Sequence, residues 1–306
     1  MTIFISVPAY CDPDLKRTIA TALKYADHPE NIYIGLVQQC DKKQRLSFDS
    51  PQIRSMWMPK EDARGVGLAR NLALQMYEDE EFYLQVDSHM IFPQGWDTKV
   101  IRSYILARDV AETEKVCINQ WPRRFDIDDG GIVKFLKGEP PMKNVVQKKN
   151  RELFHPVKYR FDDVRSNVPE ESTCMNAGYI FAPGNYVSEI PPDPAISFWG
   201  EEMVTSMRAW TRGWRFYAPK LWLSAHRYKR GGKVHRIQDQ KQLYAQLSEV
   251  SHDKQLDIWT EKEMGSVFGS PYRGAVDDYS KFVGIDLKEA YIKRQLYFNK
   301  HERGIR

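Results

Sequence analysis

The sequence predicts an α/β protein with a mostly parallel central sheet flanked by helices, followed by a helical C-terminal extension. Three observations support this prediction. Apolar runs and amphipathic segments alternate over residues 2–122. Hydrophobic residues make up 42% of the chain and charged residues 28%, as in ordinary globular proteins. A length of 306 residues is enough to bury a large core.

The N-terminal segments support the alternation one by one. Strands are expected at residues 2–8, 31–41, 81–89 and 115–122, and helices at 12–26, 65–80 and 96–112. The first helix is expected to open at Asp12 with Pro13 in its first position. In the second helix, Leu68, Leu72 and Met76 recur on one face. Such βαβ units form parallel sheets, and their ligands bind beyond the carboxyl ends of the strands.

The rest of the chain divides into three parts. Residues 121–173 are charged and predict loop excursions across the open face of the sheet or a flap over it. A short strand at 178–182, a helix at 196–214 and strand material at 215–226 follow. The remainder predicts helices. We therefore expect one domain at residues 1–235 and a C-terminal helical extension at 236–306 that packs on it.

Two metal-ligand residue types stand one residue apart at the end of the third strand. Because strand side chains alternate between faces, Asp87 and His89 point the same way and Ser88 points the other way. A carboxylate oxygen and an imidazole nitrogen placed side by side can reach one divalent cation. Such short pairs also occur at solvated strand ends without a metal. Both interpretations stay open for the pair alone.

A third ligand is expected from His226, which also ends a strand-like run, LWLSAH. Three cations follow it, Lys229, Arg230 and Lys233, and these residue types bind phosphates. Oxygen and imidazole ligands favour Mn²⁺, with Mg²⁺ as the alternative. The pattern suits a diphosphate substrate, because a divalent cation can neutralise the charge of a departing diphosphate.

The composition indicates which partners the protein binds and which cellular compartment it occupies. The net charge of +4 is too mild to indicate nucleic-acid binding by itself. No signal peptide or membrane-spanning apolar stretch is evident. The four cysteines form no CxxC pair, which suits reduced thiols better than a disulfide framework. We therefore expect a cytoplasmic protein.

Several blocks in a fixed order give the sequence a family resemblance. These are PAY, RG followed by ARN, QVDSHMIFPQGWD, NAGYIFAP, FWGEEM and SAHRYK. In this order they resemble the GT-A glycosyltransferases, whose fold has a Rossmann-like sheet. The resemblance is to the N-acetylglucosaminyltransferases that modify hydroxyproline on a cytoplasmic protein, and more distantly to the polypeptide N-acetylgalactosaminyltransferases. It spans roughly residues 2–235, and the later stretch GSPYRGAVDDYSKFVGIDLKE resembles the first family's C-terminal part.

The resemblance implies roles for individual residues. Asp87 and His89 match the Asp-x-His metal motif, and His226 matches the third ligand. The block around Glu201 and Glu202 matches a Trp-Gly-Gly-Glu segment beneath the donor sugar, but Glu201 stands where the family has a glycine. Which of these two carboxylates faces the donor therefore stays open. Together with Asp87 they are the candidate catalytic residues.

The resemblance also implies a nucleotide-sugar site. Its candidate residues are Pro8, Tyr10, Asp41, Arg64, Arg70, Ser88, Gly178, Trp199 and Lys229. The implied activity is the retaining transfer of a sugar, GlcNAc from UDP-GlcNAc, to a hydroxyl of a protein, a glycan or a modified nucleic acid. Two alternatives stay open: a nucleotide- or carbohydrate-binding module without transfer activity, and a metal-dependent nucleotidyltransferase.

Overall fold

A computed structural model describes residues 1–128, 130–148, 157–228 and 240–293. An eight-stranded sheet forms its centre, in the order β11-β13-β6-β12-β4-β1-β2-β3. Strands β3, β2, β1 and β4 are parallel, and β12 runs antiparallel to β4 and β6. The strands of this sheet are β1 Ile3–Tyr10, β2 Ile32–Gln39, β3 Ile53–Met58, β4 Phe82–Val86, β6 Val116–Ile118, β11 Glu170–Ser172, β12 Tyr179–Pro183 and β13 Arg215–Ala218. The predicted α/β class with a mostly parallel sheet is confirmed.

Residues 121–173, predicted to be mainly loop, contribute strands to two smaller sheets. One has the order β5-β14-β7-β8 and the other pairs β9 with β10. Their strands are β5 Met90–Ile91, β14 Ala225–His226, β7 Arg123–Ile127, β8 Val133–Phe135, β9 Met142–Lys148 and β10 Val157–Asp163. The prediction for residues 121–173 was wrong in this respect. These strands pair antiparallel or with distant segments, so the charged local sequence does not reveal them.

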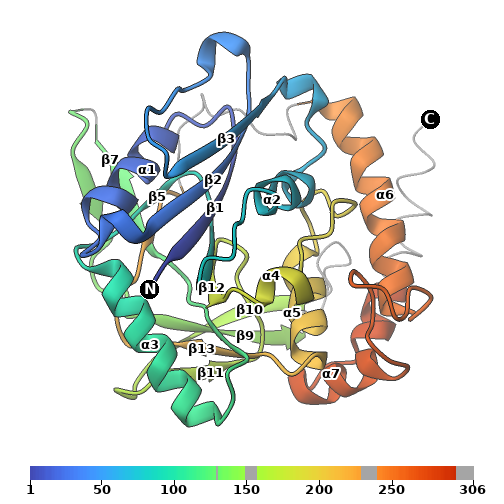
Figure 1. Cartoon of the computed structure of the whole chain (residues 1–306). Coiled ribbons are helices and arrows are strands. Elements are labelled where there is room, and N and C mark those ends of the chain that lie inside the picture. The colour runs from blue at the N-terminus through green and yellow to red at the C-terminus, as the bar shows by residue number, and fades with distance from the viewer. Residues whose placement is uncertain (129, 149–156, 229–239, 294–306) are drawn as a thin grey trace.

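Helices cover both faces of the large sheet (Figure 1). α1 and α3 share a buried cluster with β1, β2 and β4, whereas α2, α4 and α5 contribute to clusters on the other face. The α-helices are α1 Leu15–Lys24, α2 Val66–Leu74, α3 Trp96–Ala111, α4 Tyr186–Glu189, α5 Glu201–Thr211, α6 Lys241–Trp259 and α7 Ala275–Val283. The 3₁₀ turns are η1 Pro29–Asn31, η2 Lys42–Gln44 and η3 Lys60–Asp62.

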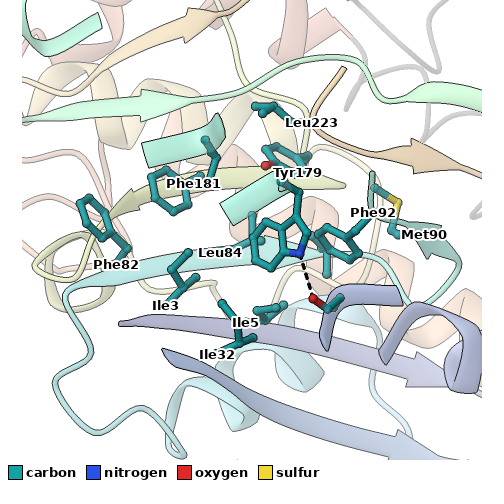
Figure 2. Close-up of a cluster of buried hydrophobic side chains, with 14 of the residues drawn as sticks. Ile3, Ile5, Ile32, Phe82, Leu84, Met90, Phe92, Tyr179, Phe181 and Leu223 are labelled. Carbon is teal, nitrogen blue, oxygen red and sulfur yellow. Dashed lines mark hydrogen bonds between the residues drawn. The ribbon is translucent and has the colours of Figure 1, made fainter. Parts of the chain in front are cut away.

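The largest buried cluster fixes the strand that carries the proposed ligands. Ile5, Leu84 and Phe181 come from three adjacent strands and are almost fully buried, as Figure 2 shows. Trp96 packs against them, and its indole N–H donates to the carbonyl of Ala22 at 2.8 Å. Because β4 is buried along its whole length, its carboxyl end is held in a defined position.

The first helix begins later than the sequence indicated. α1 starts at Leu15, and Asp12 lies before it in the chain. The Asp12 carboxylate accepts the backbone N–H of Asp14 at 2.9 Å and also contacts residues after β4. The predicted start of the helix at Asp12 was therefore too early, although Asp12 does accept a backbone N–H in the turn that precedes α1.

The C-terminal helices pack on the rest of the chain. Ile258, Trp259 and Tyr279 share a buried cluster with Met203 and Met207 of α5. Figure 1 shows α6 and α7 beside α5, on the other side of the molecule from α3. Within the described residues, no helix combines the length and apolar character needed to cross a membrane.

Candidate functional site

Asp87, His89 and His226 come together where β4 ends. One ligand atom from each residue lies within 4.8 Å of the others. His226 Nε2 lies 3.2 Å from Asp87 Oδ2, and the centroids of the two imidazole rings lie 4.4 Å apart. A carboxylate and two imidazoles at this spacing can bind one divalent transition-metal ion such as Mn²⁺. The structure therefore brings all three predicted metal ligands to one point.

Backbone pairing explains how distant parts of the chain meet here. His226 in β14 pairs with Met90 in β5, so the third ligand lies beside the segment that follows His89. The N–H of Arg227 donates to the carbonyl of His89 at 3.1 Å. The hydroxyl of Thr18 in α1 accepts the N–H of Met90 at 2.9 Å. These bonds fix the loop between β4 and β5 from both sides.

Asp12 orients His89 and was missed as a site residue. Its Oδ2 lies 2.8 Å from His89 Nδ1 and accepts the hydroxyl of Ser88 at 2.9 Å. A carboxylate on Nδ1 favours the tautomer whose proton is on that nitrogen, and in this tautomer Nε2 carries the lone pair that can bind a cation. The useful signal in the sequence was the position of Asp12 just beyond β1, at the same sheet edge as Asp87.

A buried arginine holds Asp87 from the other side. Arg70 in α2 is almost fully buried, and its Nη2 donates to Asp87 Oδ1 at 3.0 Å and to the carbonyl of Ala177 at 3.0 Å. Its Nη1 forms an ion pair with Glu201. Burial would raise the pKa of Asp87, but the hydrogen bond from His226 and the charge of Arg70 outweigh it and lower that pKa. Asp87 is thus kept ionised.

The two glutamates at the start of α5 have different environments. Glu201 is buried against Arg70 and reaches Asp87 only through that guanidinium. Glu202 is less buried, and its Oε1 accepts the backbone N–H of Ala177 at 3.0 Å. A Cβ at Gly178 would lie 3.0 Å from Asp87 Oδ2, so a larger residue there would crowd the carboxylate.

A cavity of about 330 Å³ lies at the carboxyl ends of β1 and β2, with Asp12, Gln38 and Gln44 among its lining residues. The candidate nucleotide residues stand near these ends. Pro8 lies in β1 beside Val37 of β2, and the hydroxyl of Tyr10 accepts a hydrogen bond from Gln240 at 2.6 Å.

Two further candidate nucleotide residues, Asp41 and Arg64, follow β2 and η3 in the chain. Asp41 forms an ion pair with Lys60 at 3.0 Å. The exposed Arg64 donates to the carbonyls of Glu61 and Ala63.

Trp199 lies two residues before Glu201, just before the start of α5. Its side chain is 46% exposed, and its carbonyl accepts a hydrogen bond from Gln255 at 2.6 Å. The turn before α2 approaches this segment closely, because the N–H of Val66 donates to the carbonyl of Ser197 at 2.8 Å. Lys229, proposed near the diphosphate, lies outside the described residues, as do Arg230 and Lys233.

Solved structures with a similar fold are glycosyltransferases. GalNAc-T7 with UDP, GalNAc and Mn²⁺ aligns with a TM-score of 0.57 and 13% identity, covering 98% of this chain and 58% of that one. Residues 1–349 of TarS from S. aureus align with a TM-score of 0.52 and 12% identity, over 100% of this chain and 75% of that one. The same TarS segment with UDP gives 0.50 and 13%, over 98% and 75%. At these identities the likeness shows the GT-A fold, and the chain spans little more than half of GalNAc-T7.

Sequence comparison identifies the family. A search among curated proteins found no match. A sequence model of the glycosyltransferase (GlcNAc) family matches residues 40–288, which contain Asp87, His89 and His226. Since the match covers most of the chain, the protein belongs to the glycosyltransferase (GlcNAc) family.

Proposed function

We propose that this protein is a metal-dependent retaining glycosyltransferase that moves GlcNAc from UDP-GlcNAc to an acceptor hydroxyl. The convergence of Asp87, His89 and His226 at the carboxyl end of β4 is the observation that carries the proposal. Parallel α/β sheets bind their ligands at this edge. Membership of the glycosyltransferase (GlcNAc) family supports the type of reaction and the sugar.

A divalent cation held by these three side chains would neutralise the negative charge that develops on the departing diphosphate. Neighbouring side chains fix the charge and the orientation of these ligands. Arg70 keeps Asp87 ionised and orients its Oδ2 toward His226, and Asp12 orients His89. Two imidazoles beside one carboxylate favour Mn²⁺ over Mg²⁺. The solved structure of GalNAc-T7 was obtained with UDP and Mn²⁺, which supports the same pairing of nucleotide and metal for this protein.

The remaining candidates surround this centre. We assign the nucleotide to the cavity at the ends of β1 and β2, near Tyr10 and Asp41. The donor sugar would lie against Gly178 and Glu202, since Glu202 is the more accessible of the two glutamates. Glu201 acts as a positioning residue through Arg70. In a retaining transfer the departing phosphate can accept the proton of the acceptor, so the proposal needs no side-chain base.

The acceptor is assigned only as a hydroxyl of a protein, a glycan or a modified nucleic acid. We place the active site in residues 1–235 and treat residues 236–306 as an extension, supported by the packing of Ile258 and Tyr279 against α5. The four buried, unpaired thiols support a reducing, cytoplasmic compartment.

Hydrolysis of nucleotide sugars tests the proposal without knowledge of the acceptor. Purified protein is treated with EDTA, dialysed and assayed with UDP-, GDP- and TDP-sugars, with and without Mn²⁺ or Mg²⁺. We expect slow hydrolysis that is fastest for UDP-GlcNAc, is abolished by EDTA and is restored best by Mn²⁺. Full activity of the metal-free protein would contradict the metal assignment. A preference for a GDP- or TDP-sugar would contradict the donor assignment.

A further inference from the structure

The small sheet that carries His226 has a second face with a cavity of its own. β14 and β7 are parallel neighbours, and their register pairs His226 with Arg124 and Ala225 with Arg123. Paired residues on adjacent strands point to the same face of a sheet. His226 and Arg124 therefore share the face of the metal ligands, and Ala225 and Arg123 share the opposite face.

That opposite face forms one wall of a cavity of about 530 Å³. Its other walls come from α1 and the segment after β5, and Figure 1 shows α1, β5 and β7 side by side. The side chains that define it are mainly apolar and aromatic, namely Tyr25, Phe92, Val133, Phe135 and Trp222. This volume and lining are typical of sites for small organic ligands.

The polar groups of the cavity indicate an anion. None of the described residues that line it is acidic. Arg17 is neutralised by Asp14 at 2.6 Å. Arg123, by contrast, has no carboxylate within ion-pair distance among the described residues, and its buried Nε has no acceptor there.

The contacts of Arg123 also fix its position. Its guanidinium lies 4.9 Å from the centre of the Phe135 ring, and its Nη2 donates weakly to the carbonyl of Leu136 at 3.4 Å. A cation held over an aromatic wall keeps its remaining N–H groups available to an acceptor in the cavity. An incoming anion would therefore meet a guanidinium that no carboxylate of the described residues neutralises.

We propose that this cavity is a second ligand site, separate from the donor site, for a small amphipathic anion. The ligand would have a flat apolar body that packs between Tyr25, Phe135 and Trp222. Its single sulfonate, carboxylate or phosphate group would accept hydrogen bonds from the guanidinium of Arg123. The neutral aromatic walls and the single unpaired cation among the described lining residues exclude a polyanion such as a nucleotide diphosphate as the preferred ligand.

Anilinonaphthalene sulfonate is a suitable probe, because it joins an aromatic body to one anionic group. Phenylnaphthylamine is its uncharged counterpart. Fluorescence titration of the full chain should give one saturable site for the sulfonate. Arg123→Gln should weaken the sulfonate by about tenfold to a hundredfold and leave the neutral probe nearly unchanged. Arg124→Gln is the matched control, since its side chain lies on the other face, and it should leave both probes unchanged.

Two outcomes would overturn the proposal: equal loss of sulfonate binding in both arginine variants, or no loss in either. Saturating UDP with Mn²⁺ should not compete with the probe, and competitive displacement would assign the probe to the donor site instead. If Arg123→Gln does not fold, Phe135→Ala carries the test, because Phe135 is 43% exposed and its removal should not unfold the chain. That variant should weaken both probes about threefold or more. Unchanged binding of both would contradict the site.

Discussion

Replacing Asp87 with Asn is expected to lower the turnover of UDP-GlcNAc by at least about 100-fold, or about 3 kcal/mol of transition-state stabilisation. The substitution removes the only carboxylate of the three-residue ligand set. A neutral amide binds Mn²⁺ less tightly and offers less compensation for the charge of the diphosphate–metal complex. Steady-state hydrolysis at saturating Mn²⁺ and donor measures the effect.

The same substitution should also reduce stability. Asp87 accepts a hydrogen bond from the buried Arg70 at 3.0 Å, and losing an ionised acceptor costs about 1–3 kcal/mol in free energy of unfolding. Asp109→Asn is the matched control, because Asp109 is 60% exposed and pairs with its neighbour Arg108. It should change neither turnover nor stability measurably. Wild-type turnover in the Asp87→Asn variant would show that Asp87 is not an active-site residue.

Replacing Arg70 with Met is expected to lower the free energy of unfolding by about 3–5 kcal/mol. Arg70 is buried between Asp87 and Glu201, and without it two carboxylates face each other in a poorly solvated place. Removing one member of a buried ionic network leaves an uncompensated charge, which costs far more than losing a surface ion pair. Urea unfolding followed by circular dichroism measures the change.

Arg64→Met provides the control for Arg70. Arg64 is exposed and donates to the nearby carbonyls of Glu61 and Ala63, so its loss should change the free energy of unfolding by no more than about 0.5 kcal/mol. The double variant Arg70→Met/Glu201→Gln should recover part of the lost stability, because it removes one of the two facing charges. A free energy of unfolding for Arg70→Met within about 1 kcal/mol of the wild-type value would show that the ionic network of Arg70, Asp87 and Glu201 does not stabilise the fold.

The parts of the fold that could be predicted are those with a local pattern. The buried strand before Asp87 is an apolar run, and the ligand spacing after it lies within three residues. The helix after Gly65 could be predicted because Leu68, Leu72 and Met76 recur on one of its faces. By contrast, β3 is an only partly buried edge strand, so its residues lack the apolar run that marks the other parallel strands.

The parts that could not be predicted depend on contacts between distant residues. Asp87 and His226 lie 139 positions apart, and only the pairing of β14 with β5 brings them together. Asp12 has the residue type and position of a helix cap, and its role becomes visible only when β1 and β4 are side by side. Arg70 was predicted from its position near the nucleotide segment, and its contacts with Asp87 and Glu201 could not be read from the sequence. Sequence patterns report which strand ends carry polar residues, but not which of these residues contact one another.

Binding of Mn²⁺ tests the central claim most directly. Titration of the metal-free protein with Mn²⁺ in the presence of UDP, followed by electron paramagnetic resonance, counts bound ions without any assay of transfer. We predict one tightly bound Mn²⁺ per chain in the wild type and none in His226→Ala. We also predict about tenfold to a hundredfold weaker binding in Asp12→Ala, because His89 loses the carboxylate that orients it. Equal affinity and stoichiometry in the wild type and His226→Ala would contradict the account.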